Sequence, residues 1–231
     1  MQDDPTLAEQ VAKQLRRRIL RGDLLPGAPV KERDTASTMG VSRTPMREAI
    51  RILSKEGLIV LRPSRSPIVA ELNYKSVSDQ AEVLTALEKL SAELACKNAT
   101  PTDLDELQGI VDYMAANFYD TDPLDMFEID MSFHTAIAKA SHNEALVETH
   151  RFYSQRLWHA RYLAARQRRN RERVVTQHTA ILAAMRARDA SAARAAIDTH
   201  LWQLSEDIRQ QINTQMSLAS SDEVRIQNVG E

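Results

Sequence analysis

The sequence predicts a mainly α-helical chain with two domains, residues 1–72 and 75–215, followed by a disordered tail at 216–231. Only 6 of the 231 residues are glycine and 5% are aromatic, a composition more typical of helical than of sheet-rich proteins. Apolar residues recur every three or four positions over most of the chain, and only two short segments are rich in β-forming residues. After about Ser217 the sequence is polar and aperiodic, which is typical of a disordered tail.

The first domain contains signals for three helices and one hairpin. Apolar residues at every fourth position predict a helix over 7–19, which ends at the segment RGDLLPG, and a short helix follows at about 32–39. A third helix begins after Ser42, whose hydroxyl can cap it, and Pro45 lies in its first turn. The segments LIVLRP and SPIVAEL then predict a two-stranded hairpin. This combination is the winged helix-turn-helix pattern.

The second domain is predicted to be an all-helical bundle of six helices. Thr100 before Pro101 and Asp122 before Pro123 are typical helix starts. The predicted helices span residues 77–98, 102–118, 123–141, 143–166, 170–188 and 190–214.

Charge and composition limit the classes of function. Residues 1–72 carry 13 Lys and Arg against 9 Asp and Glu, whereas residues 73–231 carry 17 against 23. The basic excess of the first domain indicates a polyanionic partner. Cys96 is the only cysteine, and the sequence has neither a signal peptide nor an apolar run long enough to cross a membrane. We therefore expect a cytoplasmic protein without membrane contact.

The third predicted helix is a candidate for DNA recognition. In a helix-turn-helix, the second helix of the turn enters the major groove with its N-terminal end. Arg43 at this end and Arg47 one turn later are predicted to lie on one exposed side, where arginine can bond to a guanine edge or a phosphate. The alternative is a capped surface helix with solvated arginines. The flanking helix, the hairpin and the basic excess favour DNA binding.

Four polar residues occupy apolar stripes in the second domain. Asp130 and His134 lie one turn apart on one predicted helix, and His178 and His200 lie in the stripes of two others. These groups are unfavourable to bury without partners, and together they suit a divalent ion, with zinc as first choice and nickel or another transition metal as alternatives. Each histidine has the alternative role of a hydrogen-bonded core residue. Three histidines without such placement are not assigned to the site: His142, His150 and His159.

The segment from Ile19 to Leu72 resembles the DNA-binding domain of the GntR family of bacterial transcription regulators. The resemblance rests on Pro26-Gly27, on VSRTP at 41–45, on REA at 47–49 and on EGL at 56–58. It implies that the hairpin tip reaches the minor groove. The DNA contacts expected for this domain are Arg33, Ser42, Arg43, Thr44, Arg47 and Arg65. Because this chain has Ser66 where the family usually has glycine, an altered turn is expected there.

From Val77 to Leu204 the chain resembles the FCD ligand-binding domain of the FadR-type branch of that family. The resemblance is carried by DMSFHTAIAKASHNEAL and QHTAILAAMRARDASAARAAIDTHL. In that domain the residues that match the four polar positions coordinate a metal: Asp130, His134, His178 and His200. Many members also have an arginine that grips a ligand carboxylate, and this chain has Leu84 at that place. Leu84→Arg is therefore expected to tighten the binding of small organic acids.

The expected protein is a homodimeric repressor or activator that reads an inverted repeat in double-stranded DNA and responds to a small-molecule effector near the metal. An organic acid is one candidate effector. Two alternatives are open for the bundle. The first is a metallohydrolase, but the sequence has no HExxH motif and no spare inward carboxylate to act as general base, so an enzyme is not expected. The second is a purely structural metal site.

Overall fold

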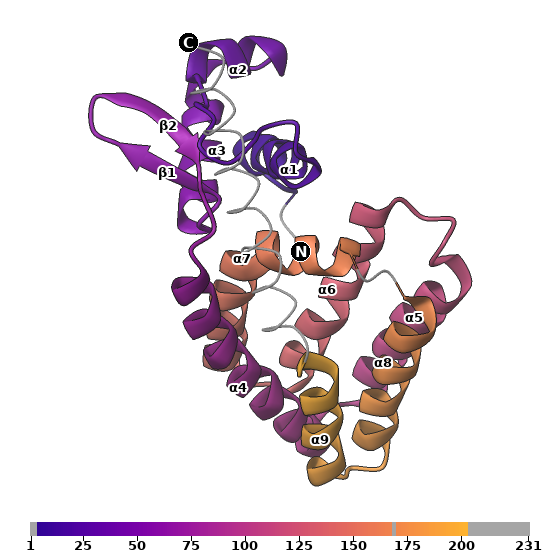
Figure 1. Cartoon of the computed structure of the whole chain (residues 1–231). Helices are drawn as coiled ribbons and strands as arrows, with labels where there is room; N and C mark the ends of the chain where they lie inside the picture. Colours follow the sequence, from indigo (N-terminus) through magenta and orange to yellow (C-terminus); the bar gives the residue numbers. More distant parts are fainter. Residues whose placement is uncertain (1–3, 168–169, 203–231) are drawn as a thin grey trace, which may run out of the picture. The chain divides into compact units, whose positions relative to one another are not determined.

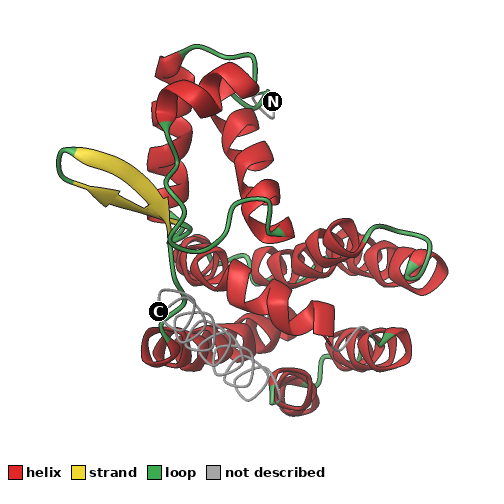
Figure 2. Cartoon of the chain, turned by 45° about the horizontal axis from the view of Figure 1, so that its top comes forward, coloured by secondary structure: helices red, strands yellow, loops and turns green. Residues whose placement is uncertain are grey.

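The computed structural model describes residues 4–167 and 170–202 and divides into two compact units, Met1–Leu72 and Asn73–Glu231. We call the first unit the winged domain and the second the bundle. The predicted fold class is confirmed, because helices dominate both units (Figures 1 and 2). Within the described part of the chain, the only strands form a single two-stranded sheet in the winged domain.

The winged domain has three helices and two strands in the predicted order. They are α1 (Leu7–Arg21), α2 (Glu32–Thr38), α3 (Arg43–Lys55), β1 (Ile59–Arg62) and β2 (Arg65–Val69). Helix α1 begins with a capping box between Thr6 and Glu9, and it ends at Gly22, whose φ of 87° is readily adopted by glycine. The strands pair antiparallel across a short turn, in which Ser64 has a φ of 56°.

An apolar core and one ion pair hold α3 in place. The buried residues that α1, α3 and the strands contribute to this core include Leu15, Ile19, Met46, Ile50, Leu53, Ile59 and Val69. Arg16 of α1 donates hydrogen bonds of 2.9 and 2.6 Å to the two carboxylate oxygens of Glu56, directly after α3. A bidentate contact of this kind has a fixed geometry, so it anchors the C-terminal end of α3 to α1 and leaves the N-terminal end exposed.

The bundle contains the six predicted helices. They are α4 (Tyr74–Asn98), α5 (Pro101–Asn117), α6 (Pro123–Ala140), α7 (Glu144–Gln167), α8 (Arg171–Arg186) and α9 (Ala190–Leu201). Helix α4 packs against α6, α7, α8 and α9 (Figure 1). The predicted starts of α5 and α6 are confirmed, because the side chains of Thr100 and Asp122 accept hydrogen bonds from backbone N–H groups of the first turn.

Some predicted boundaries differ from the observed ones. Helix α4 starts three residues earlier than predicted, because the Asn73 side chain accepts a hydrogen bond from the Ser76 N–H and caps the helix at this point. The predicted helix 190–214 is seen as α9 up to Leu201, and the rest of it lies outside the described residues, as does the tail predicted at 216–231. None of the described helices is both long enough and apolar enough to span a membrane.

Candidate DNA-binding surface and candidate metal centre

The first turn of α3 lies on the surface of the winged domain. Ser42 occupies the N-cap position, but its side chain makes no cap hydrogen bond, so the predicted role of its hydroxyl is wrong. Ser42, Arg43 and Thr44 are all exposed. The N–H groups at a helix N-terminus carry partial positive charge, and here the Ser42 hydroxyl does not occupy them. This end of α3 therefore suits a phosphate group.

Glu32 of α2 orients the two arginines predicted to read DNA. Its Oε2 accepts a hydrogen bond of 2.8 Å from Arg47 Nε and lies 3.9 Å from Arg43 Nη2. The side chains of Arg43 and Arg47 nevertheless remain 62% and 54% exposed. Both guanidinium groups are thus held on one side of α3 and still face solvent.

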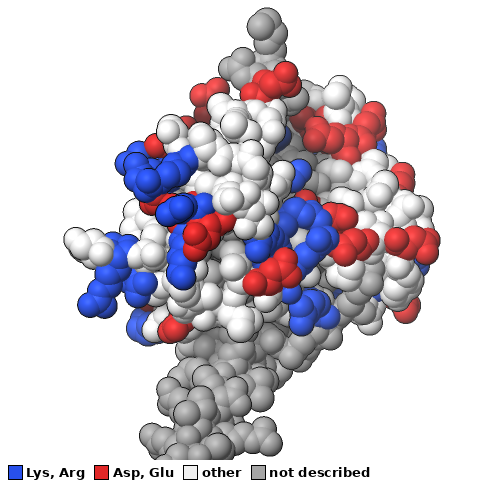
Figure 3. Space-filling view, turned by 90° about the horizontal axis from the view of Figure 1, so that it is seen from above, with Lys and Arg blue, Asp and Glu red and all other residues white. Residues whose placement is uncertain are grey.

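The remaining predicted DNA contacts are also on the surface. Arg33 on α2 and Arg65 at the start of β2 are exposed. The left-handed backbone of the hairpin turn falls at Ser64, and Ser66 lies in β2. The Ser66 carbonyl oxygen accepts hydrogen bonds of 2.9 and 2.7 Å from the Arg62 guanidinium. The altered turn expected from Ser66 stays a prediction. In the view of Figure 3, Lys and Arg side chains gather at the left and at the centre of the face, with Asp and Glu between them.

The bundle brings together the four residues predicted to bind a metal. His134 of α6, His178 of α8 and His200 of α9 each present a ring nitrogen, and these nitrogens lie within 4.8 Å of one another. His134 Nε2 and His200 Nε2 are 3.2 Å apart, and His178 Nε2 lies 3.2 Å from Asp130 Oδ1. Two atoms bound at about 2.0–2.1 Å to one tetrahedral zinc ion are about 3.3 Å apart. The two 3.2 Å distances therefore match the spacing of ligands around one ion, and the three histidine nitrogens form a group that could hold one.

Hydrogen bonds at the far side of two rings direct the lone pairs inward. Glu88 Oε2 lies 2.8 Å from His134 Nδ1, and a carboxylate only accepts, so Nδ1 carries the proton. Gln177 Oε1 lies 3.0 Å from His200 Nδ1 and has the same effect. In neutral rings this leaves the two Nε2 lone pairs facing each other. That arrangement is repulsive unless a cation lies between them.

His178 and Asp130 complete the donor set. Within the described residues, neither ring nitrogen of His178 has a hydrogen-bond partner, and neither has Asp130 Oδ1, although all three atoms are buried. Burial first, and then the neighbouring His134, hold the pKa of His178 well below its usual range, so the ring is neutral at neutral pH and able to bind a metal. Buried polar atoms without partners are unfavourable, and coordination of an ion would satisfy them.

A buried network behind His134 was missed by the sequence analysis. Glu88 of α4 is fully buried, and its Oε1 lies 3.2 Å from His150 Nε2 and 3.5 Å from Arg161 Nη1 of α7. Burial alone would raise the pKa of Glu88, but the charges and hydrogen bonds of His134 and His150 hold that pKa well below its usual range. The signal was present in the sequence, because Glu88 interrupts the apolar stripe of α4 just as Asp130 interrupts that of α6.

A cavity of about 110 Å³ adjoins the metal centre. Asp130 and His200 form part of its wall, together with Arg161, Arg166 and Arg173. The Nη1 atom of Arg161 is buried and has no hydrogen-bond partner in the described part of the chain. The cavity is therefore bordered by two of the predicted metal ligands and by three arginines.

Leu84 has no place in this wall. Its side chain is 1% exposed and it does not line the cavity. The expectation that Leu84→Arg tightens organic-acid binding stays a prediction. Arg161, which does line the cavity, is a second candidate anchor for an acidic group.

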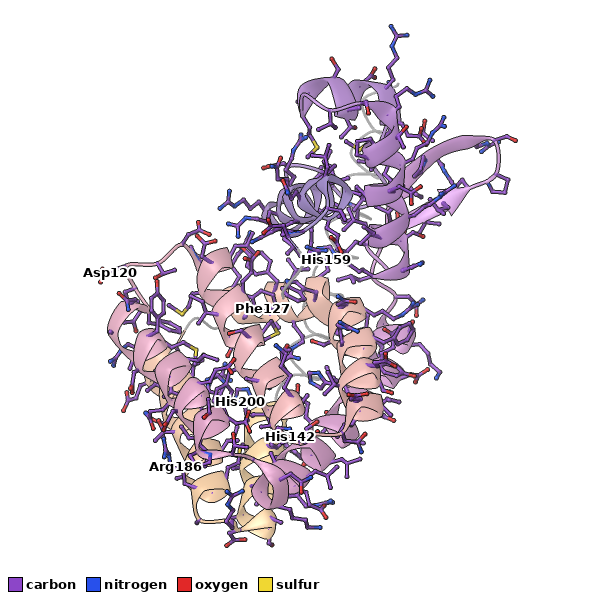
Figure 4. All side chains as sticks on the ribbon, turned by 180° about the vertical axis from the view of Figure 1, so that it is seen from behind. Asp120, Phe127, His142, His159, Arg186 and His200 are labelled. Atoms are coloured by element: carbon purple, nitrogen blue, oxygen red, sulfur yellow. The ribbon has the colours of Figure 1, made fainter. Side chains whose placement is uncertain are left out.

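The other two histidines lie outside the metal centre. His142 is half exposed and lies 2.8 Å from Asp103. His159 is buried, and burial lowers its pKa to about 4. Figure 4 shows His159 and His200 well apart in the molecule.

The winged domain, with its exposed arginines at the start of α3, defines a DNA-binding transcription regulator that carries a separate helical domain. Comparison of the sequence with known protein families supports this class of protein. Residues 7–69 match the model of the bacterial regulatory proteins of the gntR family, and residues 79–203 match the FCD domain. The chain therefore belongs to the GntR family with an FCD domain, whose members are transcription regulators and not enzymes.

Individual relatives cover most of the chain. The HTH-type transcriptional repressor RspR of Escherichia coli is 27% identical over 202 residues, which cover 87% of this chain and 89% of RspR. An uncharacterized HTH-type transcriptional regulator of Streptomyces ambofaciens is 31% identical over 199 residues, which cover 84% of this chain and 81% of that protein. The solved structure of E. coli McbR/YncC matches with a TM-score of 0.76 at 25% identity and covers 90% of this chain and 99% of that structure.

Proposed function

We propose that the chain is a homodimeric repressor whose binding to an inverted-repeat operator is controlled by a small organic acid bound beside a divalent ion in the bundle. The repressor assignment is supported by RspR, a relative named as a repressor. The homodimer is supported by the way in which helix-turn-helix proteins bind DNA, because two winged domains related by a two-fold axis match the two half-sites of an inverted repeat.

The observation that carries the proposal is the position of the metal centre on the wall of an arginine-lined cavity. An ion held by Asp130, His134, His178 and His200 would supply a positive charge that binds a carboxylate. Arg161 would supply a second positive group, and its buried Nη1 is without a hydrogen-bond partner among the described residues. Charge-assisted bonds to guanidinium are about twice as strong as neutral ones, which favours an acidic over a neutral effector.

Helix α4 offers a route from this site to the winged domain. Glu88 lies on α4. Its carboxylate is hydrogen-bonded to His134 and lies 3.5 Å from Arg161 Nη1. Only residues 70–73 separate β2 from this helix. An effector that draws Arg161 away from Glu88 would change how α4 is held in the bundle. We propose that such a change alters the spacing of the two winged domains in the dimer and thereby weakens operator binding. Thermodynamic linkage then requires that operator DNA weaken effector binding by the same factor by which the effector weakens operator binding.

Calorimetric titration of the full chain with a panel of mono- and dicarboxylic acids tests the proposal. The titration is made on zinc-loaded protein, on chelator-treated protein, and on Arg161→Met and Arg156→Met variants. Arg156 is the matched control, because it lies over the Phe152 ring on the same helix and does not line the cavity. We expect binding to the loaded wild type and to Arg156→Met, and a loss of at least about tenfold with chelator or Arg161→Met.

Other outcomes separate the alternatives. If zinc binds and raises the melting temperature but no acid binds, the ion is structural and the cavity is not an effector site. If acids bind equally well to all four samples, their site lies elsewhere in the chain. Either result contradicts the proposal.

A further inference from the structure

The wall of the cavity in the bundle becomes apolar one helical turn away from the metal centre. On α6, Met126 and Phe127 line the cavity one turn before the predicted ligand Asp130. On α8, Val174 lines it one turn before the predicted ligand His178. We call Met126, Phe127 and Val174 the apolar belt. Since one turn of helix rises about 5.4 Å, the belt lies about 5 Å along these helices from the metal ligands.

The apolar belt is packed from behind by other apolar side chains. Met126 and Phe127 are each only 4% exposed. The Phe127 ring centroid lies 5.3 Å from that of Tyr162, a second aromatic residue in the cavity wall. Val174 is half-buried and packs against the bundle core. A ligand group beside the belt therefore exchanges water for apolar surface, which favours an apolar group and is unfavourable for a charged or hydroxyl group without a partner.

The three arginines of the cavity wall differ in how strongly each can hold an acid. Arg161 is 4% exposed, and its Nη1 lies 3.5 Å from Glu88, which is itself hydrogen-bonded to His134. Arg166 is exposed, close to the end of α7, where water and salt screen its charge. Arg173 is half-buried and already has an interaction partner within the chain. The cavity therefore offers one strong position for a carboxylate, beside Arg161 and the metal centre, and little gain for a second carboxylate.

The size of the cavity limits the apolar part of a ligand. Its volume is about 110 Å³. An apolar protein cavity of roughly 150 Å³ can hold one benzene molecule. The space beside the apolar belt therefore suits a compact group of about four to six carbon atoms.

We propose that the effector is a monocarboxylate with a compact apolar body, either a branched alkyl group or a single ring, and that the apolar belt selects this acid against dicarboxylates and hydroxy acids. The carboxylate lies at the metal centre and Arg161, and the apolar body lies beside Met126, Phe127 and Val174. Ligand sites commonly combine a mostly apolar wall with a few polar groups that fix the orientation. The inference rests on the proposed function and names the class of acid that its site binds.

Calorimetric titration of the zinc-loaded full chain with 4-methylpentanoate and with succinate tests the inference. The two acids share a carboxylate and the two methylene groups next to it. At the far end 4-methylpentanoate has an isopropyl group, whereas succinate has a second carboxylate of similar shape. We expect 4-methylpentanoate to bind at least about tenfold more tightly, because succinate would place a charge beside the apolar belt.

A pair of valine variants tests whether the apolar belt causes this preference. Val174→Thr replaces a methyl group of the belt by a hydroxyl group of similar size. It should weaken the binding of 4-methylpentanoate about three- to tenfold and should not weaken that of succinate. Val175→Thr is the matched control, because Val175 is the next residue of α8 and also packs against the bundle core but does not line the cavity. It should leave both affinities unchanged, and melting temperatures of both variants are recorded to confirm that they are folded.

Three results would overturn the inference. If neither acid binds to the zinc-loaded chain, the inference fails together with the proposed function. If both acids bind only in the presence of the ion and succinate binds as tightly as 4-methylpentanoate or more tightly, the proposed function stands but the class of acid is wrong. If the two valine variants change the affinity for 4-methylpentanoate equally, the apolar belt does not hold its apolar body.

Discussion

Replacing His178 by leucine distinguishes a metal ligand from an ordinary core histidine, because the sign of the effect on stability depends on metal. The side chain is fully buried, and within the described residues both its ring nitrogens are without hydrogen-bond partners. A buried donor or acceptor without a partner costs about 1–3 kcal/mol. Leucine removes one donor and one acceptor and can still pack beside Phe133, whose ring centroid lies 4.4 Å from that of His178. Without metal, His178→Leu should therefore be more stable than the wild type by at least about 2 kcal/mol.

With metal the order should reverse. An ion at about 1,000 times its dissociation constant stabilises the folded state by about 4 kcal/mol, and a variant without the His178 ligand loses most of this gain. The variant should then be less stable than the wild type by about 2 kcal/mol. For a domain of this size the two differences correspond to melting-temperature shifts of about 4–8 °C, upward with chelator and downward with zinc.

Differential scanning calorimetry of both proteins, with chelator and with excess zinc, measures these shifts. His142→Leu is the control, because His142 is exposed and away from the site, so its effect should not depend on metal. If His178→Leu shifts the melting temperature in the same direction under both conditions, or retains one ion per chain, His178 is not a ligand.

Three further predictions concern other parts of the chain. Arg43→Ala and Arg47→Ala should each weaken binding to the operator DNA at least about tenfold and leave the melting temperature unchanged. Arg194→Ala in the bundle is the control and should not weaken operator binding. Wild-type affinity in the double Arg43/Arg47 variant would contradict the assignment of α3 as the DNA-recognition helix. Glu88→Gln should weaken zinc binding about 10- to 100-fold, since Glu88 orients His134; competition with a chromophoric chelator measures this, and unchanged affinity would leave Glu88 no such role. The unfolded chain protonates His159 near pH 6.5 but the folded chain only near 4, so its contribution to stability is present above pH 6.5 and is lost as the pH falls toward 4, by up to about 3 kcal/mol. His159→Phe should make urea stability in chelator less dependent on pH in this window, and an equally steep decline would show that His159 does not contribute to it.

Much of the fold could be predicted from the sequence because its signals are local. Apolar periodicity and caps such as Thr100 and Asp122 act within one or two helical turns, so they predict where helices form and which side of each faces inward. The same rule identified Asp130, His134, His178 and His200 as inward polar residues. Applied to α4, it would also have identified Glu88.

The tertiary structure alone decided which of these side chains meet. His134 and His200 are 66 residues apart, and no local signal fixes the 3.2 Å between their Nε2 atoms. That distance depends on the relative depth and rotation of α6 and α9, which are set by packing of the whole bundle core. The cavity beside them, the place of Arg161 in its wall and the exclusion of Leu84 from it follow from the same packing. Helical periodicity determines a direction around one helix axis, whereas a binding site requires distances between several axes, and these depend on the combined volume of all the side chains packed between the helices.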